Sequence, residues 1–316
     1  MLIRTIAGVL GLALLLVLPP ANATSPGKDG SIAYMRKDTR GHWQIWIASA
    51  SLRGAKQITR GDADSGWPVW SPDGNSIAFG SSRTDRTGTG EVNDVFVMNA
   101  EGAHVRKLTG STGISENPAW SPDGKWIAFD TDRGGGSSRQ DIVLMPSTGG
   151  KPHRVTSLPH SDAGDAAPRF SPDGTQLIFT RYRGRGQSEK AALFTIRRDG
   201  THLHQLTPFA LHAGDADWST DGTQIVFEAY PTPDGYGDIY VVPANGGTAV
   251  NLTHDPTGQA DPCWAPDGKT ILFLDNGYVN GVGRTGLATM NRNGFDRTFL
   301  SRNNQELHQP DWHSIP

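Results

Sequence analysis

The sequence has 316 residues but only one cysteine, Cys263, so no intrachain disulfide is possible and packing alone must hold the fold. It also lacks an excess of positive charge: 29 Lys and Arg stand against 32 Asp and Glu, a net charge of −3. Nucleic-acid binding usually shows as clustered, excess Lys and Arg, so we expect no nucleic-acid partner. No segment shows sustained helical periodicity, which argues against a helical protein.

Several catalytic signatures are missing as well. There is no Gly-x-Ser-x-Gly elbow, which excludes a serine peptidase of the α/β-hydrolase type. There is no His-Glu-x-x-His pattern and no pair of cysteines, so no familiar metal-binding motif is present. We therefore assign no catalytic residue and no metal ligand, and we expect no cofactor, with a divalent cation left open.

Long hydrophobic runs are absent except near the start. Arg4 is followed by an apolar run over residues 6–18, and small residues then surround a cleavage site at residues 21–23. This run is shorter than the roughly 20 residues that span a bilayer, so it predicts a secretory signal peptide rather than an anchor. We expect residues 1–23 to be removed, residues 24–316 to form one domain, and the bacterial protein to be periplasmic or secreted, without a membrane span.

The remaining composition suits a soluble protein with many turns. Hydrophobic residues make up 36% of the sequence, and it contains 39 Gly and 21 Pro. The decisive feature is an internal repeat of the pattern aromatic-Ser-Pro-Asp-Gly, with small variations, at residues 70–74, 120–124, 170–174, 218–222 and 264–268. A truncated copy follows at residues 312–314. Repeats of 40–50 residues are typical of β-propeller blades.

Each repeat unit predicts four short antiparallel strands. The aromatic residue, which we call the anchor, ends the first strand, and the Ser-Pro-Asp-Gly segment turns the chain. Second strands rich in β-branched and aromatic residues follow at residues 77–79, 127–129, 177–179, 225–227 and 271–273. Third strands are expected at segments such as 94–97 and 238–241, and fourth strands ending in Leu-Thr at segments such as 108–109 and 252–253.

Counting the units predicts a closed ring. Five units are complete, and a sixth has its second to fourth strands near the N-terminus, at residues 31–34, 44–47 and 57–59. Its first strand is found only at residues 310–312. We therefore predict an all-β, six-bladed β-propeller of four-stranded antiparallel blades, closed by the C-terminal strand joining the N-terminal blade. The anchors are expected to be packing wedges between blades, and Cys263 a buried, inert thiol.

The repeat resembles the WD40-like repeat of the TolB family over residues 29–314, in the order x-Pro-x-Trp-Ser-Pro-Asp-Gly, Ile-Ala-Phe and Leu-Thr. The resemblance implies a six-bladed propeller in the bacterial cell envelope. It covers the propeller only, because the small N-terminal α/β domain of TolB has no counterpart before the first strand. The repeat is also similar to propeller lyases of uronic-acid oligosaccharides, whose histidine ligands cannot be matched here.

Binding residues are expected where loops surround one mouth of the central channel. Three residues before each anchor, the sequence reads Trp67, Asn117, Ala167, Asp215, Asp261 and Gln309, and strand alternation makes these positions face the channel. Together with residues of the loops between and within blades, the candidate binding set is Trp67, Asn117, Asp165, His212, Asp215, Asp261, His308, Gln309, Arg83, Arg133 and Arg181. Trp67 has two interpretations, stacking on a ligand or packing under a loop.

Two functions are compatible with such a rim. The first is a monomeric, non-enzymatic binding or scaffold propeller that recognises an envelope or extracellular protein, peptide or glycan at the acidic mouth. The alternative is a propeller lyase or hydrolase that acts on glycans or small esters through channel His and Asp groups and a divalent cation. The distances among His160, His212, His254 and His308 discriminate between them, because converging imidazoles favour the enzyme.

Overall fold

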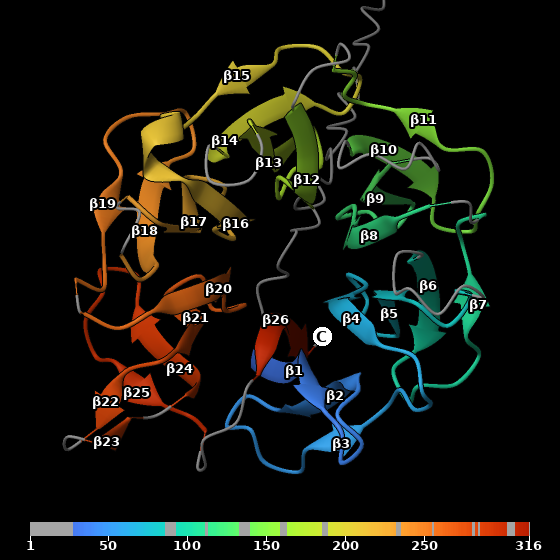
Figure 1. The fold of residues 1–316 in the computed structure, drawn as a ribbon, viewed down its shortest axis with the longest axis horizontal. Coiled ribbons are helices and arrows are strands. Elements are labelled where there is room, and N and C mark those ends of the chain that lie inside the picture. Colours follow the sequence, from blue (N-terminus) through green and yellow to red (C-terminus); the bar gives the residue numbers. More distant parts are fainter. Residues whose placement is uncertain are drawn as a thin grey trace, which may run out of the picture.

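The computed structural model describes residues 28–85, 93–110, 113–132, 140–158, 163–184, 189–231, 235–254, 256–279, 282–283, 285–301 and 307–315. The signal peptide expected at residues 1–23 and the candidate residue Arg133 lie outside these ranges. Within them the chain forms six four-stranded antiparallel sheets, arranged as a ring about a central axis (Figure 1). The predicted six-bladed propeller is therefore confirmed.

The first three blades each have four strands, named from the axis outward. Blade 1 contains β26 (His308–Ile315), β1 (Lys28–Lys37), β2 (Trp43–Ser49) and β3 (Lys56–Gln57). Blade 2 contains β4 (Ser65–Trp70), β5 (Ser76–Ser81), β6 (Asp94–Asn99) and β7 (Arg106–Lys107). Blade 3 contains β8 (Ser115–Trp120), β9 (Trp126–Thr131), β10 (Asp141–Pro146) and β11 (His153–Arg154).

The other three blades follow the same order. Blade 4 contains β12 (Ala163–Phe170), β13 (Gln176–Arg183), β14 (Lys190–Arg197) and β15 (His204–Gln205). Blade 5 contains β16 (Ala213–Trp218), β17 (Gln224–Ala229), β18 (Asp238–Pro243) and β19 (Val250–Asn251). Blade 6 contains β20 (Gln259–Trp264), β21 (Thr270–Asp275), β24 (Gly286–Asn291) and β25 (Thr298–Phe299), with a small hairpin of β22 (Tyr278–Val279) and β23 (Val282–Gly283).

Helix is almost absent from the described part of the chain. It consists of a single 3-10 turn, η2 (Phe209–Leu211), between blades 4 and 5. No helix in these residues is long and apolar enough to cross a membrane.

The ring closes as the repeat count predicts. Strand β26 pairs antiparallel with β1, with Trp312 opposite Ile32 and Ile315 opposite Lys28. The contact continues into blade 2, because the Asp311 carboxylate accepts a hydrogen bond from the Trp70 backbone N–H at 2.8 Å. The two ends of the described chain therefore complete one blade, which Figure 1 shows where the red β26 lies beside the blue β1.

The anchors pack between blades. Trp264 is fully buried, and Phe170, Trp218 and Trp312 are 1%, 3% and 5% exposed. Trp120 is half-buried, so it is the least enclosed of the set. Burying such large apolar surfaces on both faces of each sheet explains how a ring without disulfides is held together. Cys263 is also buried and unpaired, as expected.

The fourth strands differ slightly from the prediction. Each is only two residues long and ends before the Leu-Thr pair. In blade 2 the Thr109 hydroxyl accepts a hydrogen bond from the Val95 N–H at 3.1 Å and donates one to the Asp94 carboxylate at 2.7 Å. The threonine therefore continues the ladder with its side chain, which explains why an aspartate often begins the third strand.

The Ser-Pro-Asp-Gly turns are stabilised by their own side chains. In blade 4 the Ser171 hydroxyl donates to the Asp173 carboxylate at 2.6 Å, and the same carboxylate accepts the Thr175 N–H at 3.0 Å. Gly174 takes a φ of +69°, a conformation that glycine adopts without strain. Partial burial acts to raise the pKa of Asp173, but these hydrogen bonds outweigh it and lower that pKa.

We expect Asp173→Ala to lower the free energy of unfolding by about 1–2 kcal/mol, because it removes the acceptor for the hydrogen bonds within the turn. Asp173→Asn keeps an acceptor oxygen and serves as the matched control, with a loss below about 0.5 kcal/mol. Urea denaturation followed by tryptophan fluorescence measures both. An alanine variant as stable as the asparagine variant would contradict this account of the turn.

Candidate functional site

Each innermost strand carries a β-bulge at the same point. The bulged residues all have φ between 42° and 52°, and they are Trp67, Asn117, Ala167, Asp215, Asp261 and Gln309. A register shift with the second strand accompanies every one of them. These are the six positions singled out in the sequence, but simple strand alternation is not what orients them, since a bulge interrupts the pleat there. We call this set the bulge ring.

Part of the bulge ring lines a pocket on the axis, between blades 4, 5, 6 and 1. Its enclosed space is small, about 20 Å³, which is room for roughly one water-sized group. Four aspartates line it, Asp215, Asp217, Asp261 and Asp311, against a single cationic side chain, Arg169. An enclosed site with four carboxylates and one guanidinium has a negative potential whenever most of the carboxylates are ionised. We call it the axial pocket.

Asp261 holds blades 6 and 1 together at this pocket. It is 8% exposed, and its Oδ2 accepts the Gln309 backbone N–H at 3.1 Å. The Gln309 side-chain amide donates to Oδ1 at 2.7 Å, and His308 Nδ1 lies 3.1 Å from Oδ2. Three residues of the predicted set, Asp261, His308 and Gln309, are therefore neighbours here, although Asp261 lies 47 and 48 residues before the other two.

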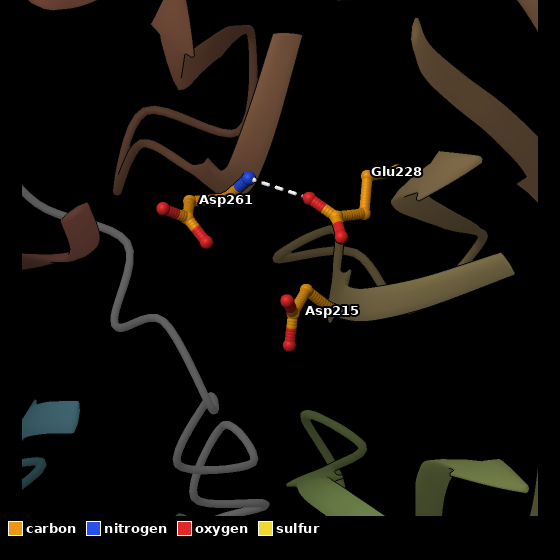
Figure 2. Close-up of side chains that lie close together, drawn as sticks. All are labelled: Asp215, Glu228 and Asp261. Atoms are coloured by element: carbon orange, nitrogen blue, oxygen red, sulfur yellow. Dashed lines mark hydrogen bonds between the residues drawn. The ribbon is translucent and has the colours of Figure 1, made fainter. Parts of the chain in front are cut away.

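A third acid, Glu228, joins Asp215 and Asp261 (Figure 2). Its Oε2 accepts the Asp261 N–H at 3.1 Å, and oxygens of the three carboxylates lie within 4.8 Å of one another. Burial, and then the charges of Asp215 and Asp261, raise the pKa of Glu228 well above its usual range. Burial and the Asp261 charge raise the pKa of Asp215 to about 6. Glu228 therefore keeps its proton under conditions that ionise ordinary carboxylates.

The side chains of Asp217 and Asp311 accept backbone hydrogen bonds in addition to carrying charge. Each accepts the N–H of the next blade's anchor at 2.8 Å, Asp217 from Trp264 and Asp311 from Trp70. Burial raises the pKa of both to about 6, although these hydrogen bonds and Arg169 act in the opposite direction. Both residues therefore link neighbouring blades through carboxylates that face the axis.

The three clustered carboxylates have the donor atoms that hard cations prefer. Oxygen ligands of this kind suit Ca²⁺ or Mg²⁺ rather than zinc. Among the residues that the structure describes, no other group of three His, Cys, Asp or Glu side chains is close enough to share an ion, and this group contains no histidine. Among the described residues, no three-ligand group therefore contains a histidine, and His160 lies outside the described ranges.

Two other candidate residues bind each other. The Arg181 guanidinium is bidentate to Asp165, at 2.6 and 2.8 Å, and both side chains are buried. The guanidinium also lies over the rings of Phe179 and Phe194, 5.4 and 4.7 Å from their centroids. This ion pair lies at the interface of blades 3 and 4 rather than at the axial pocket.

The remaining candidates are dispersed. Arg83 lies over Phe79, 5.0 Å from its centroid, and bonds to Ser81 at 3.2 Å. The Trp67 ring lies against Gly80, where an added Cβ would come within 2.9 Å of it, so packing is the better interpretation for Trp67. Asn117 donates a hydrogen bond to Asp130. His212 lines a second pocket, between blades 4 and 5.

Four residues of this site were not predicted. Arg169, Asp217 and Asp311 occupy the position just before the anchor, two residues after the bulge ring. Their fixed place directly before the anchor is the sequence signal that could have found them. Glu228 lies on the second strand directly after the apolar triplet at residues 225–227, and only the neighbouring blade's bulge brings it to Asp261.

The comparison with protein families agrees with the fold. The profile of the TolB beta propeller domain matches residues 161–314, and that of the Tricorn protease N-terminal beta propeller domain matches residues 90–208. A stretch of 65 residues is 38% identical to YuxL, an uncharacterized peptidase of Bacillus subtilis strain 168. That stretch is 21% of this chain and only 9% of the Bacillus protein.

Solved structures give the same result over most of the chain. TolB from Acinetobacter baumannii is similar with a TM-score of 0.70 and 21% identity, over 90% of this chain and 67% of that one. A protein assigned as TolB in Agrobacterium tumefaciens is similar with a TM-score of 0.63 and 20% identity, over 92% of this chain and all of that one. At this identity the likeness concerns the fold, so the chain shares the β-propeller fold of these structures, and the TolB propeller profile matches just under half of it.

Proposed function

We propose that the protein is an exported, monomeric binding propeller that recognises a cationic protein or peptide segment at the axial pocket. The observation that supports this is the charge of the pocket: Asp215, Asp217, Asp261 and Asp311 against Arg169 alone. Lysine side chains are compact point charges on long stems, so they reach into such a pocket while their backbone stays at the mouth.

The same charge balance favours a cationic peptide over a neutral glycan. A neutral sugar would have to bury against carboxylates without compensating their charge, whereas an ammonium relieves the repulsion between them. The pocket also lacks an aromatic side chain in its lining, the usual platform for a sugar ring. Export is the expectation from the leader-like residues 1–23, and the binding role agrees with the absence of catalytic motifs in the sequence.

A direct test uses a fluorescent peptide with four lysines in a Gly-Ser background, and a counterpart with glutamine in place of lysine. We expect the lysine peptide to bind the wild-type protein at least tenfold more tightly. The double variant Asp215→Asn and Asp217→Asn should lose about tenfold in affinity, or about 1.4 kcal/mol, because it removes two charges from the pocket. Fluorescence anisotropy at low salt gives the dissociation constants, and higher salt should weaken binding.

The matched control removes two charges elsewhere. Asp199 and Asp267 are exposed and lie in turns at the opposite end of the strands from the inter-blade loops. The double variant Asp199→Asn and Asp267→Asn should bind the lysine peptide as the wild type does. Equal losses in both double variants would show that the peptide responds to net charge rather than to the pocket, and would overturn the proposed function.

A further inference from the structure

The second pocket lies between blades 4 and 5, close to Glu228. It has a volume of about 490 Å³, including open solvent, and its walls come from β13, β14, β16 and β17. The rings of Tyr182 and Tyr230 line it from neighbouring blades, at the same position of the repeat, twelve residues after their anchors. We call it the inter-blade pocket. The space available to a ligand is about 210 Å³, which is below the range of drug-sized ligand sites and suits a smaller group.

The inter-blade pocket has an acidic lining, in which Glu228 is protonated while the pocket is empty and a bound cation would favour its ionised form. Glu189 and Glu228 line it against one exposed ammonium, that of Lys190. Burial and then the charges of Asp215 and Glu228 raise the pKa of the Tyr182 hydroxyl, and burial and then Glu228 and Asp215 do the same for Tyr230. Two aromatic faces combined with carboxylates form an environment that attracts an organic cation.

The other blades show which cation this fold places at such an interface. An arginine lies over the aromatic residues of the second and third strands in blade 1 (Arg36 over Trp46, 4.7 Å), in blade 2 (Arg83 over Phe96, 4.9 Å) and in blade 4 (Arg181 over Phe194, 4.7 Å). In blade 6, Arg297 lies over Phe273, at 5.4 Å, and bonds to Asp275 at 2.6 Å. The guanidinium group is therefore a recurrent partner of these aromatic residues.

Blade 5 has the aromatic pair without the arginine. Phe227 and Tyr240 stack with centroids 5.7 Å apart, like Phe179 and Phe194 in blade 4. At the two repeat positions that hold Asp165 and Arg181 in blade 4, however, blade 5 has Ala213 and Ala229. Among the described residues no arginine lies over this pair, and the inter-blade pocket opens beside Ala213.

A buried hydroxyl lies behind Gly214, a residue of the pocket lining, although its own residue does not line the pocket. Thr180 is 1% exposed, and its Oγ1 has no hydrogen-bond partner in the described part of the chain. It lies 3.8 Å from the point where a Cβ would stand on Gly214, a residue of the pocket lining. Glu228 Oε1 lies 4.0 Å from that point. An unsatisfied acceptor and a carboxylate therefore flank one small space next to Gly214.

We propose that the inter-blade pocket binds a guanidinium group, the side chain of an arginine in a bound segment, between the rings of Tyr182 and Tyr230 and against Glu228. This rests on the proposed function, since the arginine would belong to the same cationic partner that enters the axial pocket. A planar guanidinium stacks on tyrosine and donates to a carboxylate at the same time, which an ammonium does less well.

The first test uses N-acetyl-L-arginine amide and its uncharged isostere, N-acetyl-L-citrulline amide, titrated into the intact protein and followed by protein-observed NMR. We expect the arginine amide to bind at least tenfold more tightly than the citrulline amide. Equal affinity of the two probes would overturn the proposal. So would tighter binding of cellobiose, which would mark the two tyrosines as a sugar platform instead.

The second test fills the space next to Gly214. Gly214 has no positive φ, and an added Cβ would meet its neighbours only at ordinary contact distance, so Gly214→Ala should fold normally. We expect it to bind the arginine amide at least tenfold more weakly. Gly110→Ala, where an added Cβ meets nothing within 4 Å, is the matched control and should bind like the wild type. An unchanged affinity in Gly214→Ala would overturn the proposal.

A third variant keeps the test independent of that glycine. Tyr230 is 38% exposed, so Tyr230→Leu should fold, and it should lose about fivefold in affinity for the arginine amide while Tyr230→Phe keeps most of it. The lysine peptide separates this proposal from the proposed function. If that peptide binds wild type and Gly214→Ala alike while the arginine amide binds neither, the inter-blade proposal fails and the axial pocket keeps its role.

Discussion

Removal of residues 305–316 is expected to unfold the whole propeller instead of shortening a tail. The deletion takes away β26, the innermost strand of blade 1, and with it Trp312, which is 5% exposed. It also removes the Asp311 hydrogen bond to the Trp70 N–H, so blade 2 loses a partner too. A loss of at least about 5 kcal/mol is expected, which equals the whole stability of many domains.

Circular dichroism and urea denaturation would measure this loss, and two further variants make the result specific. Trp312→Ala removes only the buried ring and should cost about 3–5 kcal/mol. Val250→Ala, at a site 53% exposed on an outer strand, should cost less than about 0.5 kcal/mol. A synthetic peptide of residues 305–316 should restore part of the structure of the truncated protein. A truncated protein that melts cooperatively at the wild-type temperature would contradict this closure of the ring.

The protein is expected to be more stable at pH 5 than at pH 7.5. The folded-state pKa of Asp215, Asp217 and Asp311 is raised by burial to about 6, against about 3.9 in an unfolded chain. The folded state therefore binds more protons than the unfolded state between about pH 4 and pH 6, and stability falls as pH rises through this window. These side chains keep some access to water, so we expect roughly 1 kcal/mol from each, or about 3 kcal/mol in total.

The aspartates of the Ser-Pro-Asp-Gly turns determine the pH below which stability falls again. Hydrogen bonds from Ser219 and Thr223 outweigh partial burial and lower the pKa of Asp221 to about 2, and similar bonds lower that of Asp173. Their stabilising effect is present above about pH 4 and is lost as pH falls further. Thermal unfolding between pH 3 and pH 8 should therefore show a maximum near pH 4.

Asparagine substitutions test which groups cause the effect. The double variant Asp217→Asn and Asp311→Asn keeps an acceptor oxygen for the N–H groups of Trp264 and Trp70 but cannot ionise. It should match the wild type near pH 4 and exceed it by about 2 kcal/mol at pH 7.5. A wild-type protein whose melting temperature rises steadily from pH 5 to pH 7.5 would contradict the assigned role of these carboxylates.

The fold could be predicted from the sequence because the repeat carries its own register. The Ser-Pro-Asp-Gly turns mark where each first strand ends, and the anchor shows which side chains pack between blades. Even the split blade could therefore be completed, with residues 310–312 as its first strand. Strand length was less predictable. The fourth strands stop at two residues because the side chain of Thr109 and its equivalents takes over the hydrogen bonds of the ladder.

The site was predicted only in part, because its geometry depends on contacts between blades. Asp215, Asp261, His308 and Gln309 were identified and do meet, through a bulge that no local sequence pattern announces. Arg181 and Asp165 were both expected to bind a ligand, yet they bind each other inside the interface of blades 3 and 4. A charged residue in a repeat protein can therefore form an ion pair at an interface between blades as readily as it binds a partner.

The bulge ring has a consequence for how such a protein can diversify. Its six positions share one left-handed backbone conformation, with φ of 42–52°, yet they carry Trp, Asn, Ala, Asp, Asp and Gln. The scaffold therefore imposes the direction of the side chain while leaving its chemistry open. Substituting these residues one at a time would change which ligands bind along the axis without altering the strands. Asparagine and glycine would be the safest substitutions, because they tolerate this backbone conformation best.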